Sequence, residues 1–471
     1  MSKTPQISSG QKFINDLGLY AIGNIGSKLI TFLLVPLYTF FITDPADFGY
    51  YDICLTAAFI MAPIICLQLT EGSFRLLIET SELSRRRSII TFTFITIARN
   101  SLLLGLLAVF IGYATDIRYL SYIVIYGIIL CTYDVCIQIT RGLNEIKTYM
   151  FLGIFNAAAI AGYSLLTVVI MDLGVPGIFL ANIAARITSL LFLELRLHIV
   201  KTYFGLRYIS KTVSHELLSY SLPLLPMILI WWILNSNNLF FIKHYLGLDE
   251  NGIYAVLCKF TGILYILANI FYQSWQQNAI EKYNSSERDS FFSSIFNNYF
   301  YLLCFLVAVF PFALRVNYFW LVSEEYRSSA DYLFLNSLFV MSFSMASFFE
   351  VPYQCAKRTA RILPSIVIAV VVNITLNYLL IRSMGLTGVI ISGIATYTVA
   401  IIYRVIDTKK YTTISVAARN LIPVVLVAGA GVGFHTSWSS GSDILFTLIL
   451  IGLFIFFLPK QLREFAINKF K

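Results

Sequence analysis

The strongest constraint on the fold is a series of long apolar runs that fills almost the whole sequence. Each run is close to the roughly 20 residues that an α-helix needs to cross about 30 Å of hydrocarbon. The runs cover 13–42, 50–74, 89–113, 118–141, 149–171, 175–197, 217–243, 252–279, 291–317, 329–355, 362–382, 386–406, 414–435 and 442–458. Continuous apolar runs favour helices over the alternating strands of a barrel. We therefore expect an all-α membrane protein with about 14 transmembrane helices.

The composition agrees with a membrane protein. Hydrophobic residues make up 58% of the chain and charged residues only 13%, whereas an average soluble domain carries roughly 25% charged residues. The net charge of +9 comes from basic residues in short gaps between the apolar runs, which is typical of loops beside anionic lipid. We expect no nucleic-acid partner, because no gap is long enough for a nucleic-acid-binding module.

The positions of lysine and arginine predict the orientation. If the N-terminus is cytoplasmic, most of the chain's 34 Lys and Arg residues fall on the cytoplasmic side, among them 85–87, 357–358 and 409–410. Short cytoplasmic loops carry this excess of positive charge. We expect a multi-pass protein with both termini in the cytoplasm.

Residues for catalysis or metal binding do not group in the sequence. The four histidines lie in loops or at helix ends, and the seven cysteines are scattered in or beside apolar runs. No metal-ligand spacing, phosphate-binding loop or nucleophile elbow is present. We expect no enzyme, no cofactor and no metal site.

Two short motifs occur twice. The acidic-glycine stretch 47–51 before the second helix is similar to 250–254 before the eighth, and the GxxG stretch 173–178 before the sixth is similar to 384–389 before the twelfth. The members of each pair are six predicted helices apart, which indicates two halves of equal orientation related by an axis along the membrane normal. The alternative is that these are unrelated turns at helix starts.

The repeat predicts the domain organisation. We expect two parallel six-helix lobes around a central cavity, followed by two further C-terminal helices. The predicted boundaries are 1–197 for the first lobe, 198–216 for a cytoplasmic connecting loop, 217–406 for the second lobe and 407–471 for the last two helices and a cytoplasmic tail.

Four cations fall inside predicted helices. They are Lys28, Arg99, Arg186 and Lys259. A charge near the bilayer centre costs about 2.5–3.5 kcal/mol on insertion scales, so it normally faces a cavity or a partner. We interpret the four as candidate contacts in a positive cavity that suits an anionic substrate such as a phosphate or pyrophosphate.

Intramembrane carboxylates offer the alternative explanation. Asp134 is the candidate partner for Arg99 across neighbouring helices, and Glu71 has the spacing to pair with Arg75 one turn away. Asp134 and Glu350 are also the acids that we would test first for coupling to an ion.

Amides and aromatic residues form a second polar set. Asn24, Trp231, Asn235, Asn238 and Gln273 lie within predicted helices. Aromatic faces beside amides suit a sugar, and we take these five as tentative glycan contacts. The alternative is structural, because Trp favours membrane interfaces and buried amides join helices.

Several short stretches form a familiar pattern, namely 18–24 with Lys28 and 34–38, then 48–52, 221–226 and 252–254. Together they resemble the polysaccharide transporter family of the multidrug, oligosaccharidyl-lipid and polysaccharide exporter superfamily. This family includes the O-antigen and capsule repeat-unit flippases. The resemblance implies two six-helix lobes in a V, and cations on helices 1 and 8 that meet a pyrophosphate, where this chain has Lys28 and Lys259. Lysine provides point-charge contacts rather than bidentate ones.

The resemblance also implies a location, the bacterial inner (cytoplasmic) membrane, and a function. We expect a flippase that moves undecaprenyl-pyrophosphate-linked oligosaccharide units from the cytoplasmic to the periplasmic leaflet, for O-antigen, capsule or exopolysaccharide assembly, with a polysaccharide polymerase and assembly machinery as partners. The first alternative is a cation-coupled multidrug antiporter of the same superfamily, which usually has twelve helices and an acidic cavity. A glycan polymerase or ligase needs a large catalytic loop, and no gap in the sequence has that length.

Overall fold

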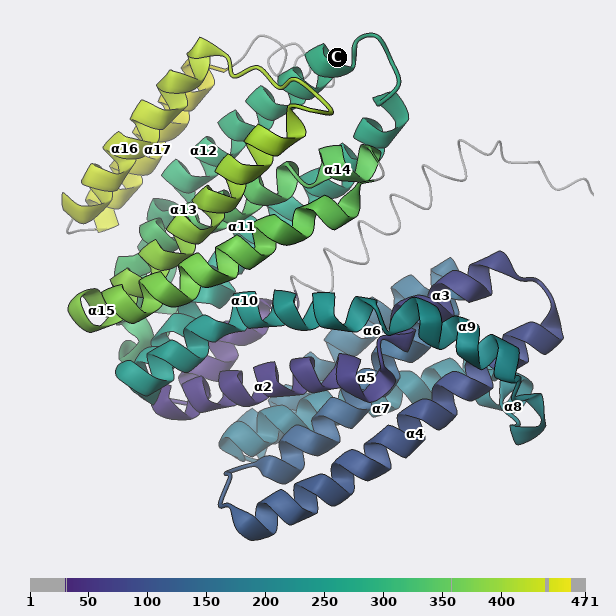
Figure 1. Ribbon diagram of the computed structural model, residues 1–471. Helices are drawn as coiled ribbons and strands as arrows, with labels where there is room; N and C mark the ends of the chain where they lie inside the picture. The colour runs from purple at the N-terminus through teal and green to yellow at the C-terminus, as the bar shows by residue number, and fades with distance from the viewer. Residues whose placement is uncertain (1–29, 31, 357, 437–439, 459–471) are drawn as a thin grey trace, which may run out of the picture. The chain divides into compact units, whose positions relative to one another are not determined.

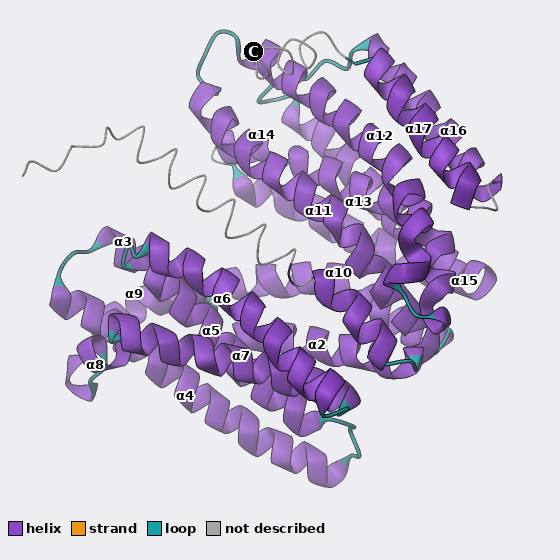
Figure 2. Cartoon of the chain, turned by 180° about the vertical axis from the view of Figure 1, so that it is seen from behind, coloured by secondary structure: helices purple, strands orange, loops and turns teal. Residues whose placement is uncertain are grey.

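The protein is built of helices. The computed structural model describes residues 30, 32–356, 358–436 and 440–458. Figure 2 shows helices joined by short loops, and no strand occurs in the described residues. Eleven helices among them are long and apolar enough to cross a membrane. The predicted all-α membrane class is confirmed, and the chain is a multi-pass membrane protein.

The eleven candidate spans account for most of the predicted runs. The longest, Thr359–Thr408, contains two predicted runs, 362–382 and 386–406. The backbone is non-helical at Gly385, which separates the two. Phe32–Phe41 and Gly441–Phe456 are shorter apolar helices within the first and last predicted runs. The number fourteen itself stays a prediction.

The chain divides into two compact units. Unit 1 comprises residues 1–42 and 50–236, and unit 2 comprises 43–49 and 237–471. The predicted lobes 1–197 and 217–406 stay a prediction. By packing, residues 211–221 belong to unit 1, where α9 contacts α3 and α4.

Unit 1 is a bundle around α5 and α7. Its helices are α2 (Pro45–Cys66, from residue 50), α3 (Leu69–Glu79), α4 (Leu83–Ala114), α5 (Leu120–Gly142), α6 (Ile146–Ser164), the π-helix Leu165–Ile170, α7 (Gly174–Leu197), α8 (Ile199–Tyr203), α9 (Lys211–Ser221) and the first part of α10 (Leu224–Tyr245). Phe179 of α7 is 1% exposed and packs against the rings of Tyr51, Tyr122 and Tyr126. The outer surface of α4 exposes large apolar side chains such as Leu106 and Phe110, as a lipid-facing helix does.

The predicted single helix 50–74 is broken, which corrects the sequence prediction. Leu67 and Gln68 have left-handed φ values of 51° and 57°, and they separate α2 from α3. Left-handed backbone is unfavourable for residues with a Cβ, so packing must hold the break in place. No glycine marks it in the sequence.

Hydrogen bonds satisfy the carbonyls that this break exposes. The backbone N–H groups of the two left-handed residues donate to Pro63 (3.0 Å) and Ile64 (3.3 Å). Asn100 of α4 donates through Nδ2 to the carbonyl of Ile65 at 2.8 Å. An amide from a neighbouring helix thus completes the last turn of α2, where carbonyls lack helical partners.

We expect Asn100→Leu to destabilise unit 1 by about 1–3 kcal/mol, because the Ile65 carbonyl then loses its donor in an apolar region. Thermal unfolding of the purified protein in detergent measures this loss. Asn317→Leu is the control, since Asn317 is exposed and donates only to Ala313 of its own helix. Equal stability of the two variants would contradict the prediction.

Unit 2 is a second bundle built on α11, α12 and α13. It contains the rest of α10, α11 (Leu248–Lys282), α12 (Arg288–Leu321), the 3₁₀-helix Glu324–Tyr332, α13 (Leu333–Phe348), α14 (Val351–Cys355), α15 (Leu363–Thr408), α16 (Leu421–Thr436) and α17 (Ser440–Phe456). Its core includes Trp275, which stacks on Phe348 at 4.6 Å and donates from its indole to the Phe348 carbonyl.

The last two helices pack on α12. In Figure 1 α16 and α17, in yellow, run side by side, and both contact α12. Arg315 of α12 donates from Nε to Asp443 of α17 at 2.7 Å, and its guanidinium lies 3.9 Å from the centre of the Phe434 ring of α16. An ion pair and a cation–π contact therefore join this pair of helices to unit 2.

The second repeated motif has the same conformation in both units. Gly174 and Gly385 have φ values of +58° and +56°, which glycine adopts without steric penalty. Three residues later, an added Cβ at Gly177 or Gly388 would lie 2.9 or 2.6 Å from a carbonyl oxygen of the preceding helical segment. Matching strain-free turns and close approaches support a true internal repeat.

The first repeated motif brings its two members together within unit 2. An added Cβ at Gly49 would lie 2.5 Å from the backbone nitrogen of Gly252, and one at Gly252 would overlap the carbonyl of Pro45. Asn251 donates to the Gly49 carbonyl at 3.3 Å. The start of α2 thus crosses the start of α11 with backbone against backbone, as small residues permit in membrane helices.

The predicted helix 217–243 and the loop before it also differ in detail. The chain from 198 to 216 contains α8, a 3₁₀ turn and the start of α9 rather than an open loop. The helix breaks between α9 and α10 at Leu222 and Pro223. Proline has no N–H for the helical ladder, which explains the break.

Candidate functional site

In unit 1 the intramembrane cation Arg186 is enclosed by aromatic rings. It is 8% exposed, and its guanidinium lies 4.8 Å from the ring centre of Tyr126 and 5.9 Å from that of Tyr133. It donates to the backbone and side-chain oxygens of Asn182, both at 3.1 Å. Arg186 is also the cation that acts electrostatically on Asp134 of α5. The arrangement is a buried cation in a cation–π shell on α7, which packs against α5, the helix that carries Asp134.

Asp134 lines a small cavity in unit 1. The cavity measures about 170 Å³, and its wall includes Gln68, Thr70 and Trp232. Trp232 stacks on Phe59 at 5.4 Å. The broken backbone at residues 67–68 lies at this wall, and irregular backbone at membrane depth is tolerated where it is buried in protein or lines a cavity. A carboxylate, an amide and an aromatic face therefore line one pocket.

Arg99 lies elsewhere in unit 1. It is exposed on α4, and its Nε donates to Asn100 at 3.1 Å. It lines a surface pocket with Phe94 and Phe204. Arg186, and not Arg99, is the cation that acts on Asp134, so the pairing expected from the sequence is not formed. Arg75 likewise pairs with Glu79 at 3.1 Å rather than with Glu71.

Among the candidate cations that the structure describes, Lys259 lies in unit 2. It lies on α11, seven residues after Gly252, so both face the segment 43–49. Its ammonium is 5.4 Å from the ring centre of Phe48, which is fully buried. Lys259 thus sits beside the glycine crossing of the repeated motif.

Glu350 pairs with an arginine that the sequence analysis did not single out. Arg404 of α15 donates from Nη1 to Glu350 at 2.8 Å and to the Ala346 carbonyl at 2.7 Å, while its Nε donates to Ser365 at 2.9 Å. Its side chain is only 5% exposed. The buried charge is therefore both paired and hydrogen-bonded, which is the condition for keeping it in an apolar interior.

We expect Arg404→Met to lower the stability of unit 2 by about 3–5 kcal/mol, because it leaves the Glu350 carboxylate without its counter-charge. Arg404→Met combined with Glu350→Leu should recover much of the loss, since no buried charge remains. Thermal unfolding in detergent measures both. The control is Arg361→Met, whose half-exposed ion pair with Asp407 should contribute less than about 1 kcal/mol.

Asn238 belongs to a buried amide cluster. Its Nδ2 donates to Tyr254 at 3.2 Å, and its Oδ1 accepts from Asn377 at 2.8 Å. Asn377 also donates to Asn373, which donates to Thr396. Asn238 is 5% exposed, and the cluster joins α10, α11 and α15. This geometry favours the structural alternative, in which amides hold helices together.

Of the other tentative glycan residues, the structure describes the side chain of Gln273. Gln273 is exposed on α11 and donates to Asn269 at 3.0 Å. Trp231 and Asn235 lie on α10, but their side chains are outside the described part of the chain. Asn24 and Lys28 lie outside the described residues altogether.

In the parts of the chain that the structure describes, no group of three or more His, Cys, Asp or Glu side chains has an arrangement for a metal ion.

Comparison with known sequences gave no assignment. No protein-family model matches the chain. No curated protein matches it either.

Comparison with solved structures gave clear matches of fold. The lipid II flippase MurJ, in an inward closed conformation, superposes with a TM-score of 0.71 at 12% identity, covering 96% of this chain and 100% of the flippase. A multidrug-resistance MATE transporter of the MOP superfamily, in an inward-facing conformation, has a TM-score of 0.64 at 13% identity and covers 83% of this chain and 98% of its own. A MOP-superfamily transporter from Pyrococcus furiosus has a TM-score of 0.57 at 13% identity, covering 84% and 96%.

These matches define the class of fold. The chain has the helical fold shared by the MurJ flippase and the MATE transporters. At 12–13% identity the likeness concerns the fold, and function depends on the site that a fold carries.

Proposed function

We propose that this protein is a flippase for undecaprenyl-pyrophosphate-linked oligosaccharide units, which it moves from the cytoplasmic to the periplasmic leaflet by alternating access. The observation that carries the proposal is the match to a lipid II flippase over 96% of this chain and all of the flippase. The MATE transporter covers 83%. A twelve-helix transporter has no counterpart of the C-terminal pair α16–α17. This is consistent with the smaller share of this chain that the MATE transporter covers.

The intramembrane cations support an anionic substrate. Lys28 and Lys259 are proposed to hold the pyrophosphate as point charges. Arg186 is proposed to contribute positive potential from inside unit 1, since its aromatic shell and Asn182 keep it in place. Arg99 is proposed as a further cation for the phosphate. Asn24, Trp231, Asn235 and Gln273 are proposed to contact the glycan.

Genetic deletion tests the proposal. A strain that lacks the gene should accumulate undecaprenyl-pyrophosphate-linked units on the cytoplasmic face of the inner membrane and lose a surface polysaccharide. Mass spectrometry of the lipid-linked intermediates identifies the glycan, and re-expression of the intact chain is the control. Unchanged intermediates in the deletion strain would reject the flippase function.

A second candidate is a cation-coupled multidrug antiporter. The observation that favours it is the unit 1 cavity in which Asp134 lies beside the stacked Trp232 and Phe59 rings. A carboxylate near aromatic faces suits a cation or a proton. In this case the deletion strain should accumulate a cationic drug and keep its lipid-linked intermediates, and Asp134→Asn should reproduce that phenotype.

A further inference from the structure

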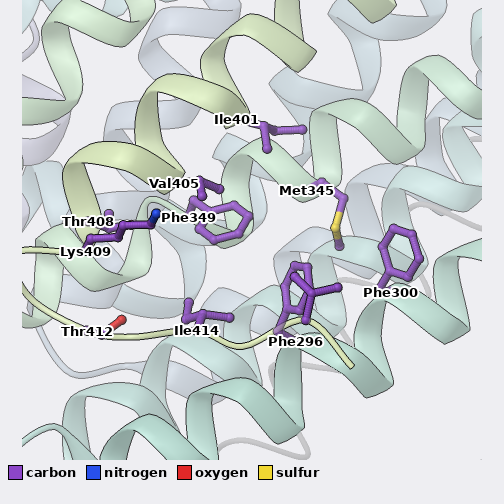
Figure 3. Close-up of a pocket in the computed structure, with 11 residues that line it drawn as sticks. Phe296, Phe300, Met345, Phe349, Ile401, Val405, Thr408, Lys409, Thr412 and Ile414 are labelled. Atoms are coloured by element: carbon purple, nitrogen blue, oxygen red, sulfur yellow. The ribbon is translucent and has the colours of Figure 1, made fainter. Parts of the chain in front are cut away.

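Unit 2 contains a pocket apart from the charged residues discussed above. It lies between α12, α13, the end of α15 and the segment 412–416, and its volume is about 220 Å³. Figure 3 shows its lining, with the side chains of Thr408, Lys409 and Thr412 grouped at one side. The pocket therefore has a polar end and an apolar body.

The apolar body is made of aromatic and aliphatic side chains. Phe296 and Phe300 come from α12, Met345 from α13, and Ile401 and Val405 from α15. Phe296 and Met345 are core residues, 7% and 5% exposed. Since Phe296 and Met345 are held in the core, this part of the pocket wall is preformed.

Thr412 provides the polar end with an unused hydroxyl. The residue is 3% exposed and lines the pocket, and its Oγ1 has no hydrogen-bond partner among the described residues. The hydroxyl of Thr408, by contrast, donates to the Arg404 carbonyl at 2.6 Å. A buried hydroxyl without a partner costs about 1–3 kcal/mol, so a ligand that accepts its proton would stabilise the site.

Lys409 makes the polar end positive. The nearby carboxylate of Asp407 already binds Lys410 at 2.5 Å and Arg361 at 3.4 Å. Lys409 forms no ion pair in the part of the chain that the structure describes, and it lines the pocket. Three cations, Arg361, Lys409 and Lys410, therefore lie near a single carboxylate, that of Asp407. Lys409 is the cation that lines the pocket, and it can pair with an anionic ligand.

We propose that this pocket binds an anionic phospholipid, with one acyl chain along the apolar body and the phosphate at Lys409 and Thr412. The volume of about 220 Å³ is below the roughly 300 Å³ of the smallest sites for whole drug-sized ligands, so it fits part of one chain. The headgroup accepts the Thr412 proton and pairs with the Lys409 ammonium. The site is separate from the proposed substrate contacts of unit 2, because neither Lys259 nor Gln273 lines the pocket.

Lipid-dependent stability tests the proposal. The intact protein is purified in a neutral detergent, and its unfolding midpoint is measured with mixed micelles of phosphatidylglycerol, with phosphatidylcholine of the same chains, and with inorganic phosphate. We expect phosphatidylglycerol to raise the midpoint and the other two to leave it unchanged. A rise with inorganic phosphate alone, or an equal rise with phosphatidylcholine, would overturn the proposal.

Two variants locate the effect. Lys409→Gln and Thr412→Val should each weaken phosphatidylglycerol binding about tenfold, as loss of a hydrogen bond to a charged group predicts. Without lipid, Thr412→Val should be as stable as the wild type or more so, because it removes an unpartnered hydroxyl. Arg419→Gln, an exposed cation outside the pocket, is the control. Equal binding by all variants would reject the site.

Discussion

Replacing Gly252 by alanine is expected to prevent unit 2 from folding in its native form. An added Cβ at this position overlaps the carbonyl oxygen of Pro45, which is backbone and cannot rotate away. The start of α2 must therefore separate from α11, and the Asn251 to Gly49 hydrogen bond is lost with it. Overpacking of a core commonly costs about 1–3 kcal/mol, and a clash between backbones belongs at or above the upper end of that range.

The matched control lies on the same helix. Gly262 of α11 has open space where a Cβ would be added, so Gly262→Ala should keep or raise stability, because alanine favours the helix by about 1 kcal/mol. Monodispersity in detergent and the thermal unfolding midpoint compare the two. If Gly252→Ala were as stable as Gly262→Ala, the backbone crossing described here would be incorrect.

The glycine motifs that indicate an internal repeat could be recognised from the sequence, and the repeat itself stays a prediction. The pairs 47–51 with 250–254 and 173–178 with 384–389 are short motifs, and each contains a glycine that the structure requires for a left-handed φ or a close backbone approach. The helices were predictable from the apolar runs, because a segment that spans lipid must satisfy its own backbone hydrogen bonds.

The break at Leu67 and Gln68 was not predictable in the same way. Neither residue is a turn former, and the hydrogen bond that supports the break comes from Asn100, on the next helix. The pairing of Arg404 with Glu350 joins residues 54 positions apart. Such contacts depend on how helices pack in three dimensions, which periodicity along one sequence does not contain.

The candidate site residues also differ in how far the sequence could predict their surroundings. A cation inside an apolar run can be recognised from the sequence, and Arg186 and Lys259 are indeed within helices. The neighbours of these cations cannot be recognised in the same way. Asp134 and Tyr126 lie on α5, and they come near Arg186 only because α5 packs on α7. Asn238 shows the reverse case, since an amide that seemed suited to a sugar lies in a cluster joining helices.

Under the proposed flippase function, the largest functional effect is expected for Lys259→Gln, which should reduce transport about tenfold or more. Loss of the proposed charge-assisted contact to a pyrophosphate removes roughly 1.5–3 kcal/mol, and each 1.4 kcal/mol is a factor of ten. Stability should change little, because an exposed or half-buried cation–π contact such as that with Phe48 contributes only about 0.5–1 kcal/mol.

Lys259→Arg and Lys282→Gln complete the experiment. Arginine keeps the positive charge, so Lys259→Arg should retain most of the transport. Lys282 lies in the last turn of the same helix, 4.4 Å from the Phe291 ring centre, and its replacement controls for the loss of one lysine from α11. Transport is measured as restoration of surface polysaccharide in the deletion strain, with protein level and unfolding midpoint recorded for each variant. Full restoration by Lys259→Gln would exclude Lys259 as a substrate contact, whereas equal loss in the glutamine and arginine variants with a lowered midpoint would assign it a structural role beside Phe48.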